Sequence, residues 1–546
     1  ALSEVISLGA IIPFIGIISA PETILKNNFI QFVADFFSLK TTNEIKIALT
    51  FIFIFSAILA SFLRIFVLWM STKFSVNLGS EISKEVYRKT LYQPYEVHLN
   101  RNSSELVSAM TDKINTVIFK VIVPALNFLS SFLIFISIIF VLIFLNWKVA
   151  FFAIFIIGIF YILVSFFVRN YLARNSKEIS EKQNTVVKLL QEGLGGIREV
   201  VLGNTQSVYV KKYIISDYPL RNAIGINSFI SGSPRYVIEL MAIILIVVLS
   251  YYLSNSDNGI TESLPLLGAM ALGGQRVLPA LQQCYASWTA VRGFNNTTKD
   301  IIDLLNQNEG QYNEIEGKHK IKKLIFSNQI ELKNISFRYS DTSPWIIQDL
   351  DLRINKGSKV GIVGKTGCGK STLIDILSGL LYPTSGSVYI DGKKLDNELL
   401  RSWQKNISYV PQTVFLSDSS IENNIILGSE NQTMDPDKLL SSSKKAMIDE
   451  FVGSLDNKFK TIVGERGGRI SGGQRQRIGI ARAFYKDASI MFLDEATNAL
   501  DEHTEEMILN NIFELDTDKT VFFITHKKEI LNKFDIIFEF KNQNVT

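Results

Sequence analysis

A glycine-rich loop set between a strand and a helix is the feature that most restricts what this chain can fold into. Residues 359–363 form a short apolar run typical of a buried strand, and residues 373–380 have a helical pattern. The sequence between them is GKTGCGKST, which has the spacing G-x-x-x-x-G-K-S of a phosphate-binding P-loop. Because strand, loop and helix occur together, an ordinary glycine-rich turn is a poor alternative. The chain is expected to contain an α/β domain of the P-loop NTPase type.

This loop predicts how the phosphates of ATP would be held. Glycines let backbone N–H groups close around phosphate oxygens, and the following helix N-terminus adds partial positive charge. Lys370 is expected to reach the β- and γ-phosphates, and Ser371 is expected to bind Mg²⁺. The residues expected to contact the nucleotide here are Gly364, Lys365, Thr366, Gly367, Cys368, Gly369, Lys370, Ser371 and Thr372.

An acidic pair follows a second apolar run. Residues 489–493 have the composition of a buried strand, which would carry Asp494 to the same Mg²⁺. Glu495 comes next and is expected to polarise the attacking water as a general base. Two acids at a strand end can be unrelated to chemistry, but the P-loop upstream favours the catalytic interpretation.

A further anion-binding loop lies between these two elements. It consists of Ser471, Gly472, Gly473 and Gln474, just before a helical stretch at residues 478–484. A helix N-terminus attracts negative charge, yet one P-loop does not need a second phosphate site in its own chain. The additional loop is explained if it covers the γ-phosphate of an ATP held by a second subunit.

The first 300 residues have a different composition from the rest. They contain 43 charged residues, whereas the other 246 contain 65. Six segments are apolar enough to cross a bilayer, which needs about 20 residues in a helix. These expected spans are residues 2–20, 45–70, 117–145, 149–168, 224–253 and 264–293. The first is expected to be truncated, because the chain begins with Ala1 inside an apolar run.

Lys and Arg counts orient these spans. Residues 71–116 contain six and residues 169–222 contain nine, while residues 254–263 contain none. The first two segments are therefore expected in the cytoplasm. Both have helical patterns with a break, near Gln93-Pro94-Tyr95 and near Gly203-Asn204.

Two shorter segments of this half carry predictions of their own. Residues 146–148 are expected to form a tight hairpin between the third and fourth spans. Residues 28–39 gather apolar side chains on one face, as expected of a helix that lies on the outer membrane surface.

Several other classes of protein are excluded by composition. The net charge is only +4, which gives no support to a nucleic-acid-binding surface, and no nucleic-acid partner is expected. Cys284 and Cys368 are the only cysteines, so a disulfide framework is excluded. The four histidines are scattered in the sequence, which argues against a structural zinc site.

Taken together, the P-loop, the acidic pair and the Ser471–Gln474 loop resemble the ATP-binding cassette of ABC transporters. The resemblance covers residues 328–546. Residues 1–304 would be an all-α transmembrane domain of six helices, and residues 305–327 a polar linker. A membrane domain followed by one cassette resembles an ABC exporter half-transporter, an ATPase coupled to transport.

This resemblance implies roles for further residues. Tyr339 would stack on adenine, and Gln412 would contact Mg²⁺ and the attacking water. His526 resembles the switch histidine that contacts the γ-phosphate. The implied catalytic set is thus Glu495, His526 and Gln412, and the implied Mg²⁺ ligands are Ser371, Gln412 and Asp494.

Two other segments match the family, and two positions depart from it. Residues 463–467 resemble the motif before the signature loop, and residues 499–501 resemble the D-loop. Ile470 stands where Leu is usual, and Asn498 stands where Ser is usual. Both departures are mild.

The family implies a membrane-embedded homodimer with a cytoplasmic cassette, placed here in a bacterial inner membrane. Each of two ATP sites would use the P-loop of one chain and Ser471–Gln474 of the other. A heterodimer with a second gene product stays open. The breaks near 93–101 and 204–213 look like the two coupling helices.

The charges inside the expected spans bear on the substrate. They are Arg64, Arg235, Glu239 and Arg276, and such charges are costly in a bilayer. Arg235 and Glu239 are one helical turn apart and can simply pair with each other. Three arginines facing one cavity would instead suit a substrate that carries phosphate.

These positions, with the 28–39 segment, are similar to those of bacterial flippases for lipid-linked oligosaccharides. That resemblance implies that Arg64, Arg235 and Arg276 engage a polyprenyl pyrophosphate. A multidrug or lipid exporter of the same fold is the first alternative, and it would tolerate Arg64→Ala. A cassette that gates a channel or acts as a sensor is the second, and Glu495 and His526 count against it.

Overall fold

The computed structural model describes residues 41–254, 259–307, 322–427, 434–513, 518–541 and 544–545. The expected first span and the surface helix at residues 28–39 lie outside these ranges. Two compact units are present: Ala1–Gln93 with Asn100–Glu309, and Pro94–Leu99 with Gly310–Thr546. Each unit is considered by itself.

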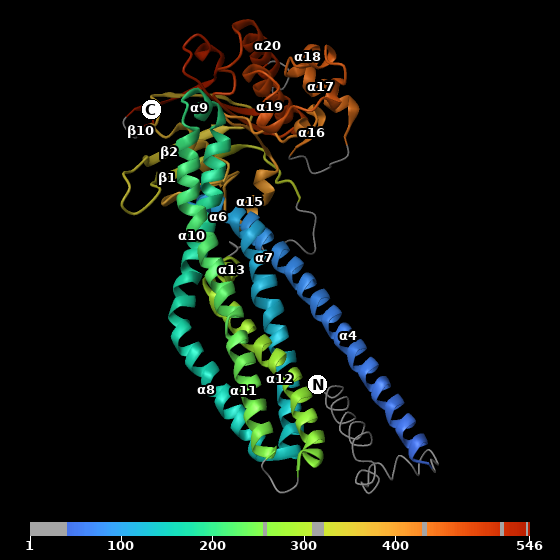
Figure 1. The fold of residues 1–546 in the computed structure, drawn as a ribbon. Coiled ribbons are helices and arrows are strands. Elements are labelled where there is room, and N and C mark those ends of the chain that lie inside the picture. The colour runs from blue at the N-terminus through green and yellow to red at the C-terminus, as the bar shows by residue number, and fades with distance from the viewer. Residues whose placement is uncertain are drawn as a thin grey trace. The chain divides into compact units, whose positions relative to one another are not determined.

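The first unit is helical throughout its described residues (Figure 1). Its elements, which include two π-helical turns, are α4 (Thr42–Leu91), α6 (Ser103–Ser108), η1 (Ala109–Lys113), α7 (Ile114–Val117), η2 (Ile118–Ile122), α8 (Val123–Gly195), α9 (Ile197–Leu202), α10 (Gln206–Gly232), α11 (Pro234–Ser254), α12 (Gly259–Gly293) and α13 (Asn295–Leu305). The short helix α5 (Tyr95–Asn100) follows the break at Gln93-Pro94, as predicted, and all of it except Asn100 belongs to the second unit.

Three helical stretches among the described residues are long and apolar enough to cross a membrane. They are Asn43–Leu91, Ser103–Phe140 and Phe155–Gly195. They contain or overlap the expected second, third and fourth spans. Many large apolar side chains on them are exposed, for example Phe62 at 64% and Phe167 at 75%, as expected for a surface that faces lipid.

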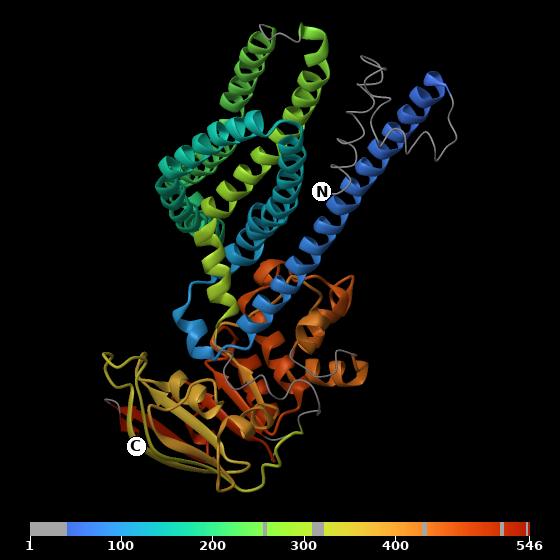
Figure 2. The same ribbon diagram turned by 90° about the horizontal axis from the view of Figure 1, so that it is seen from below.

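The predicted hairpin at residues 146–148 contains no non-helical loop, because the backbone is helical from Val123 to Gly195. This stretch contains no glycine or proline that would interrupt the helical hydrogen bonds. The α8 ribbon changes direction along its length instead of ending, and α12 packs along it (Figures 1 and 2).

The expected fifth span is not one helix. Residues 224–253 are divided between α10 and α11, with Ser233 between them. Pro234 has no backbone N–H and fits the first position of a new helix, which explains the break. The expected sixth span lies within α12.

The second break forms its short helix earlier in the chain than predicted. The helix is α9, whereas residues 206–213 belong to the long helix α10. Gly196 and Gly203 stand on either side of α9, and Asn204 adopts a left-handed φ of 51°. The backbone conformation departs from the helix at Gly196 and at Asn204, so the short helix lies before the expected range 204–213.

Buried polar contacts join the helices at the cytoplasmic end of the expected spans. The Asn175 amide donates to Asn227 at 2.9 Å, which connects α8 and α10. The Ser180 hydroxyl and the Lys113 ammonium both donate to the Asp300 carboxylate. Lys113 is 2% exposed, so η1, α8 and α13 meet around a buried charge.

The second unit contains two sheets. Their strands are β1 (Gln329–Phe337), β2 (Ile347–Asn355), β3 (Lys359–Gly364), β4 (Ser385–Ile390), β5 (Lys393–Lys394), β6 (Ile407–Val410), β7 (Ile490–Asp494), β8 (Thr520–Ile524), β9 (Ile536–Lys541) and β10 (Asn544–Val545). One sheet is antiparallel with the order β2-β1-β4-β5, and the other has the order β10-β9-β3-β8-β7-β6. From β9 to β6 the second sheet is parallel, which buries both of its faces.

Helices accompany these sheets. They are α14 (Lys370–Leu377), α15 (Asn397–Gln404), α16 (Ile421–Ile426), α17 (Pro436–Lys445), α18 (Asp449–Gly453), α19 (Gly472–Lys486) and α20 (Glu502–Phe513), with short 3₁₀ turns η4 (Lys458–Lys460), η5 (Glu465–Gly467) and η6 (Leu531–Lys533). Trp403 is fully buried and donates its indole N–H to Leu377 O at 2.8 Å, which fastens α15 to the end of α14. The expected strand, loop and helix around the P-loop are therefore present.

Candidate functional site

The parallel sheet brings the predicted site residues to one edge. Strands β3, β8, β7 and β6 are neighbours that run in the same direction, so their carboxyl ends meet. The P-loop follows β3, and His526 follows β8. Asp494 ends β7, and Gln412 comes two residues after β6. Side chains separated by more than a hundred positions thus come from adjacent strand ends.

The P-loop depends on glycine at two close approaches. Gly364 has φ +152° and Gly369 has φ +105°, both outside the range that other residues adopt readily. A Cβ on Gly369 would lie 2.8 Å from Ile346 Cγ2, so space is lacking as well. A Cβ built on Gly367 would have no other heavy atom within 4 Å, so the space beside the middle of the loop is unfilled by this chain's described residues.

Lys370 is folded back onto its own loop. Its ammonium donates to Gly364 O at 2.9 Å and to Lys365 O at 3.1 Å, and the residue is 6% exposed. The positive charge is thereby held at the start of α14, where the helix N-terminus also attracts anions.

Glu495 is the centre of the polar contacts at this edge. Its Oε2 accepts from Gln412 Nε2 at 2.9 Å and from Asn498 Nδ2 at 2.8 Å. Its Oε1 lies 3.0 Å from His526 Nε2. Gln412 and His526, which the resemblance assigned to catalysis together with Glu495, therefore both contact the Glu495 carboxylate.

Asp494 is the buried partner of the P-loop serine. Burial raises the pKa of its carboxyl and the charge of Glu495 does the same, while hydrogen bonds from Ser371 and Tyr409 and the charge of Lys370 oppose the rise. A hydroxyl and a carboxylate in contact form the hard oxygen donor set that Mg²⁺ prefers. Among the described residues no three His, Cys, Asp or Glu side chains form a metal cluster.

Tyr339 lies beside the end of the P-loop. Its ring packs edge-on against Phe337 with 5.0 Å between centroids, and its hydroxyl is 3.3 Å from Thr372 Oγ1. Tyr339 is 39% exposed, so part of this residue is accessible next to the phosphate loop.

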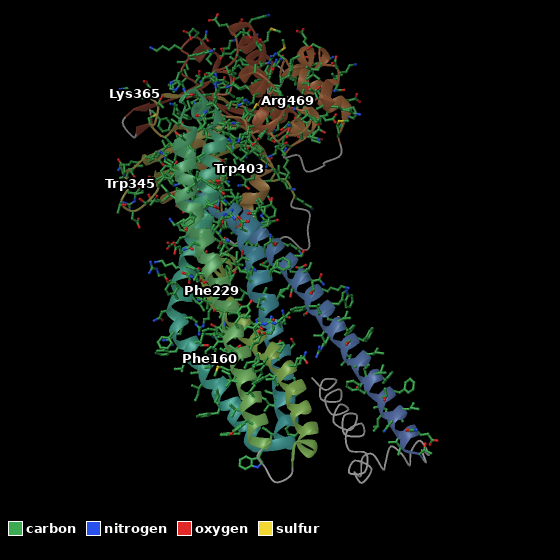
Figure 3. The ribbon with its side chains drawn as sticks, viewed as in Figure 1. Phe160, Phe229, Trp345, Lys365, Trp403 and Arg469 are labelled. Carbon is green, nitrogen blue, oxygen red and sulfur yellow. The ribbon has the colours of Figure 1, made fainter. Side chains whose placement is uncertain are left out.

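The Ser471–Gln474 loop forms the N-terminus of α19 with a capping box. Gln474 N donates to Ser471 Oγ at 3.2 Å, and Ser471 N donates to Gln474 Oε1 at 2.8 Å. Within the same unit, Lys365 of the P-loop and Arg469, just before this loop, lie well apart (Figure 3). The structure of one chain therefore does not bring the two anion-binding loops together.

The D-loop, residues 499–501, is packed against α19. Ala499 N donates to Gln476 Oε1 at 2.9 Å, and a Cβ on Gly473 would lie 2.9 Å from Ala499 O. The Asp501 carboxylate accepts from Thr504 N, and this hydrogen bond lowers the pKa of the carboxyl.

Two contacts at the site were not predicted from the sequence. Asn498 was identified as a departure from the family pattern, yet its amide holds Glu495. Tyr409 bonds to Asp494 from β6. Their positions in the sequence could have indicated both residues. Asn498 is three residues from Glu495, and Tyr409 is three residues from Gln412.

The three arginines expected to bind substrate come from different helices. Arg64 is exposed on α4, and the side chain of Arg276 on α12 is outside the described side chains. Arg235 on α11 donates to Glu239 Oε1 at 2.5 Å. The simple pairing of Arg235 with Glu239 is therefore present.

Comparison with known families agrees with this architecture. Residues 8–258 match the ABC transporter transmembrane region, and residues 347–498 match the ABC transporter domain. The chain therefore belongs to the ABC transporters. It is a half-transporter of the exporter type, in which a helical transmembrane domain is fused to an ABC ATPase domain on the cytoplasmic side of the membrane.

Two curated relatives illustrate the range of the family. An ATP-dependent lipid A-core flippase of Pseudomonas aeruginosa is 28% identical over 491 residues, which is 88% of this chain and 77% of that protein. A mitochondrial iron-sulfur clusters transporter, atm1, of Neurospora crassa is 38% identical over 229 residues. That match covers 41% of this chain and about a third, 32%, of the relative.

A solved structure shares the fold. It is a bacterial Atm1-family ABC exporter with ATP bound, with a TM-score of 0.78 and 20% sequence identity. The match covers 98% of this chain and 93% of that one. It supports the exporter fold and carries no information on the substrate.

Proposed function

We propose that two copies of this chain form an ATP-driven transporter, in which ATP hydrolysis at shared sites moves an amphipathic substrate across a bacterial inner membrane. The observation that carries the proposal is the Glu495 carboxylate, held by Gln412, Asn498 and His526 at the sheet edge that also presents the P-loop. A site built only for binding would not need this carboxylate.

Each residue of the site has a separate role in the proposed hydrolysis of ATP. The P-loop N–H groups and Lys370 would bind the phosphates, and Ser371, Gln412 and Asp494 would hold Mg²⁺, which would supply positive charge to neutralise the phosphate oxygens. Glu495 orients the attacking water and accepts its proton. His526 contacts the γ-phosphate, and Tyr339 stacks on the adenine.

Replacing Glu495 by Gln tests the hydrolytic part. The variant keeps the shape of the side chain but removes the base, so ATP turnover should fall by about 100-fold or more, while ATP binding persists. Turnover is measured on the purified full chain in proteoliposomes, with Glu450→Gln, an exposed change on α18, as the matched control. Equal turnover in the two variants would remove Glu495 from the mechanism.

For the substrate, we propose a lipid-linked oligosaccharide with a polyprenyl pyrophosphate. Arginine forks bind phosphate oxygens in two places at once, and charge is otherwise expensive inside a span. Arg64, Arg235 and Arg276 are the residues that would engage the pyrophosphate. The Pseudomonas relative is named as a flippase of lipid A-core, which is in keeping with a lipid-linked cargo here.

Flipping of a fluorescent lipid-linked oligosaccharide tests this assignment. Arg64→Ala, Arg235→Ala and Arg276→Ala, singly and combined, should reduce flipping more than basal ATP turnover. Arg221→Ala is the control, since Arg221 pairs with Asp217 in the cytoplasmic extension of α10. Unchanged flipping in the combined variant would exclude the pyrophosphate.

One observation favours a second candidate, a multidrug or lipid exporter. Arg235 already has an acidic partner one turn away, so its charge is compensated without a substrate. In this case the combined arginine variant would transport an apolar cation at the wild-type rate.

A further inference from the structure

A buried carboxylate outside the proposed catalytic set links two of its loops. Glu505 lies on α20, four residues after the D-loop aspartate, and is 5% exposed. A buried carboxylate is costly unless each oxygen has a partner. Glu505 has a different partner on each oxygen, and neither partner belongs to its own helix.

The first partner follows Glu495. The Thr497 hydroxyl donates to Glu505 Oε1 at 2.7 Å, and Thr497 is itself 2% exposed. The same short turn is closed by Asn498 N, which donates to Glu495 O at 3.3 Å. The Glu505 carboxylate therefore holds the turn that carries the proposed base.

The second partner follows His526. The Lys527 ammonium pairs with Glu505 Oε2, and Lys527 N donates to Thr525 Oγ1 at 3.0 Å. Thr525 N donates in turn to Ile362 O at 3.2 Å, next to the start of the P-loop. A charge-assisted bond to Lys527 thus orients the turn that carries the proposed switch histidine.

We infer that Glu505 is a positioning residue, which sets the Glu495–His526 spacing by holding the turn after each of them through one carboxylate. The inference rests on the proposed function, because it assigns Glu505 to hydrolysis at that site. Displacing a reacting group by about 1 Å can cost about 100-fold in rate, so loss of this link should act on turnover rather than on nucleotide affinity.

The test compares Glu505→Gln with Glu506→Gln, whose side chain is exposed on the same helix. In the full chain in proteoliposomes, Glu505→Gln should lower kcat for ATP by about 10- to 100-fold with KM changed little, since the P-loop is untouched. Lys527→Met should match it, Lys527→Arg should restore most of the activity because it keeps the charge, and the double variant Glu505→Gln/Lys527→Met should lose no more than either one alone.

A second measurement does not depend on turnover. Amide hydrogen exchange in residues 495–501 and 525–527 should rise in Glu505→Gln in both segments together, and in neither for Glu506→Gln. The inference is overturned if exchange is unchanged, or if Glu505→Gln lowers only the thermal midpoint while kcat per folded molecule stays at the wild-type value. Absence of turnover in wild-type protein would contradict the proposed function instead, and the exchange result would still decide the role of Glu505.

Discussion

Glu495 occupies a backbone conformation that most residues avoid. Its φ is +48°, in the left-handed region, which costs an L-residue about 1–2 kcal/mol. The chain turns at this point directly after β7, and Asn498 then reaches the Glu495 carboxylate from three residues on. Strain of this kind is retained where surrounding contacts compensate for it, which the bonds from Gln412 and Asn498 do here.

The second residue with an unusual environment is Asp375 on α14. Burial raises the pKa of its carboxyl from 3.8 to about 6, and the negative charge of Asp494 adds to the shift. Because the pKa of the Asp375 carboxyl is higher in the folded protein than in the unfolded chain, protonation of this carboxyl favours the folded state. This stabilisation is fully present below about pH 4. That contribution is lost as the pH rises through 6.

Asp375→Asn should therefore stabilise the protein at neutral pH. The gain should be about 1–2 kcal/mol at pH 7.5 after allowance for partial solvent screening, and it should disappear below pH 4. Unfolding of the full chain followed across this pH range measures it, with the exposed change Asp456→Asn as a control. A gain that does not depend on pH would show that the charge of Asp375 is not its source.

The residues of the candidate site could be identified from sequence to different degrees. The P-loop and Asp494 follow local patterns of strand, turn and helix, so their positions were predictable. The contact between Glu495 and Asn498 was not, because it depends on the left-handed φ at Glu495. Glu505 was also missed, since the partners on its two oxygens come from Thr497 and from Lys527 on another loop.

Among the elements, breaks in helices were harder to predict than the helices themselves. Hydropathy located apolar segments but could not show that residues 146–148 stay helical or that Ser233 divides α10 from α11. A hydropathy profile averages over about 20 residues, whereas a break in a helix is determined by a single proline or glycine. The π-helical turns η1 and η2 were not predicted from the sequence.

The Lys113–Asp300 pair supplies a prediction for the helices it joins. Asp300→Asn leaves a buried ammonium without its carboxylate, which should cost up to about 3 kcal/mol of stability, because Asp300 itself is partly exposed. Thermal unfolding of the full chain in detergent measures the loss. Asp303→Asn, exposed on the same helix, is the control.

A variant that replaces both members of this pair separates charge from packing. Lys113→Met/Asp300→Leu should be closer to wild type than Asp300→Asn, since no unpaired charge stays buried. If Asp300→Asn and Asp303→Asn unfold at the same temperature, the pair does not stabilise the contact of η1, α8 and α13.

At the scale of the whole molecule, the difference in charge between the first 300 residues and the rest has a physical cause. The first unit exposes apolar side chains along helices long enough for a bilayer, and the second buries its apolar residues in two clusters around its sheets. Composition was therefore sufficient to separate membrane and soluble parts. It could not show how the two anion-binding loops of the second unit relate to each other.

The separation of those loops within one chain predicts shared ATP sites. Lys370→Ala removes the phosphate-binding lysine, and Ser471→Ala removes the cap of α19, so each variant alone should lose ATP turnover. When both chains are co-expressed and the mixed dimer is purified with two tags, one site contains an intact Lys370 and an intact Ser471. Turnover should be partly restored in the mixed dimer, and no recovery would contradict sites built from two chains.

The bonds of Lys370 to its own loop have a consequence for how that residue is probed. Its ammonium donates hydrogen bonds to two carbonyls of the loop. The side chain therefore stabilises the shape of the P-loop, in addition to its proposed role as a ligand for phosphate. A nucleotide must compete with those carbonyls for the ammonium. Replacing the lysine consequently removes two things at once, the charge that attracts the ligand and the scaffold that keeps the loop in shape beforehand.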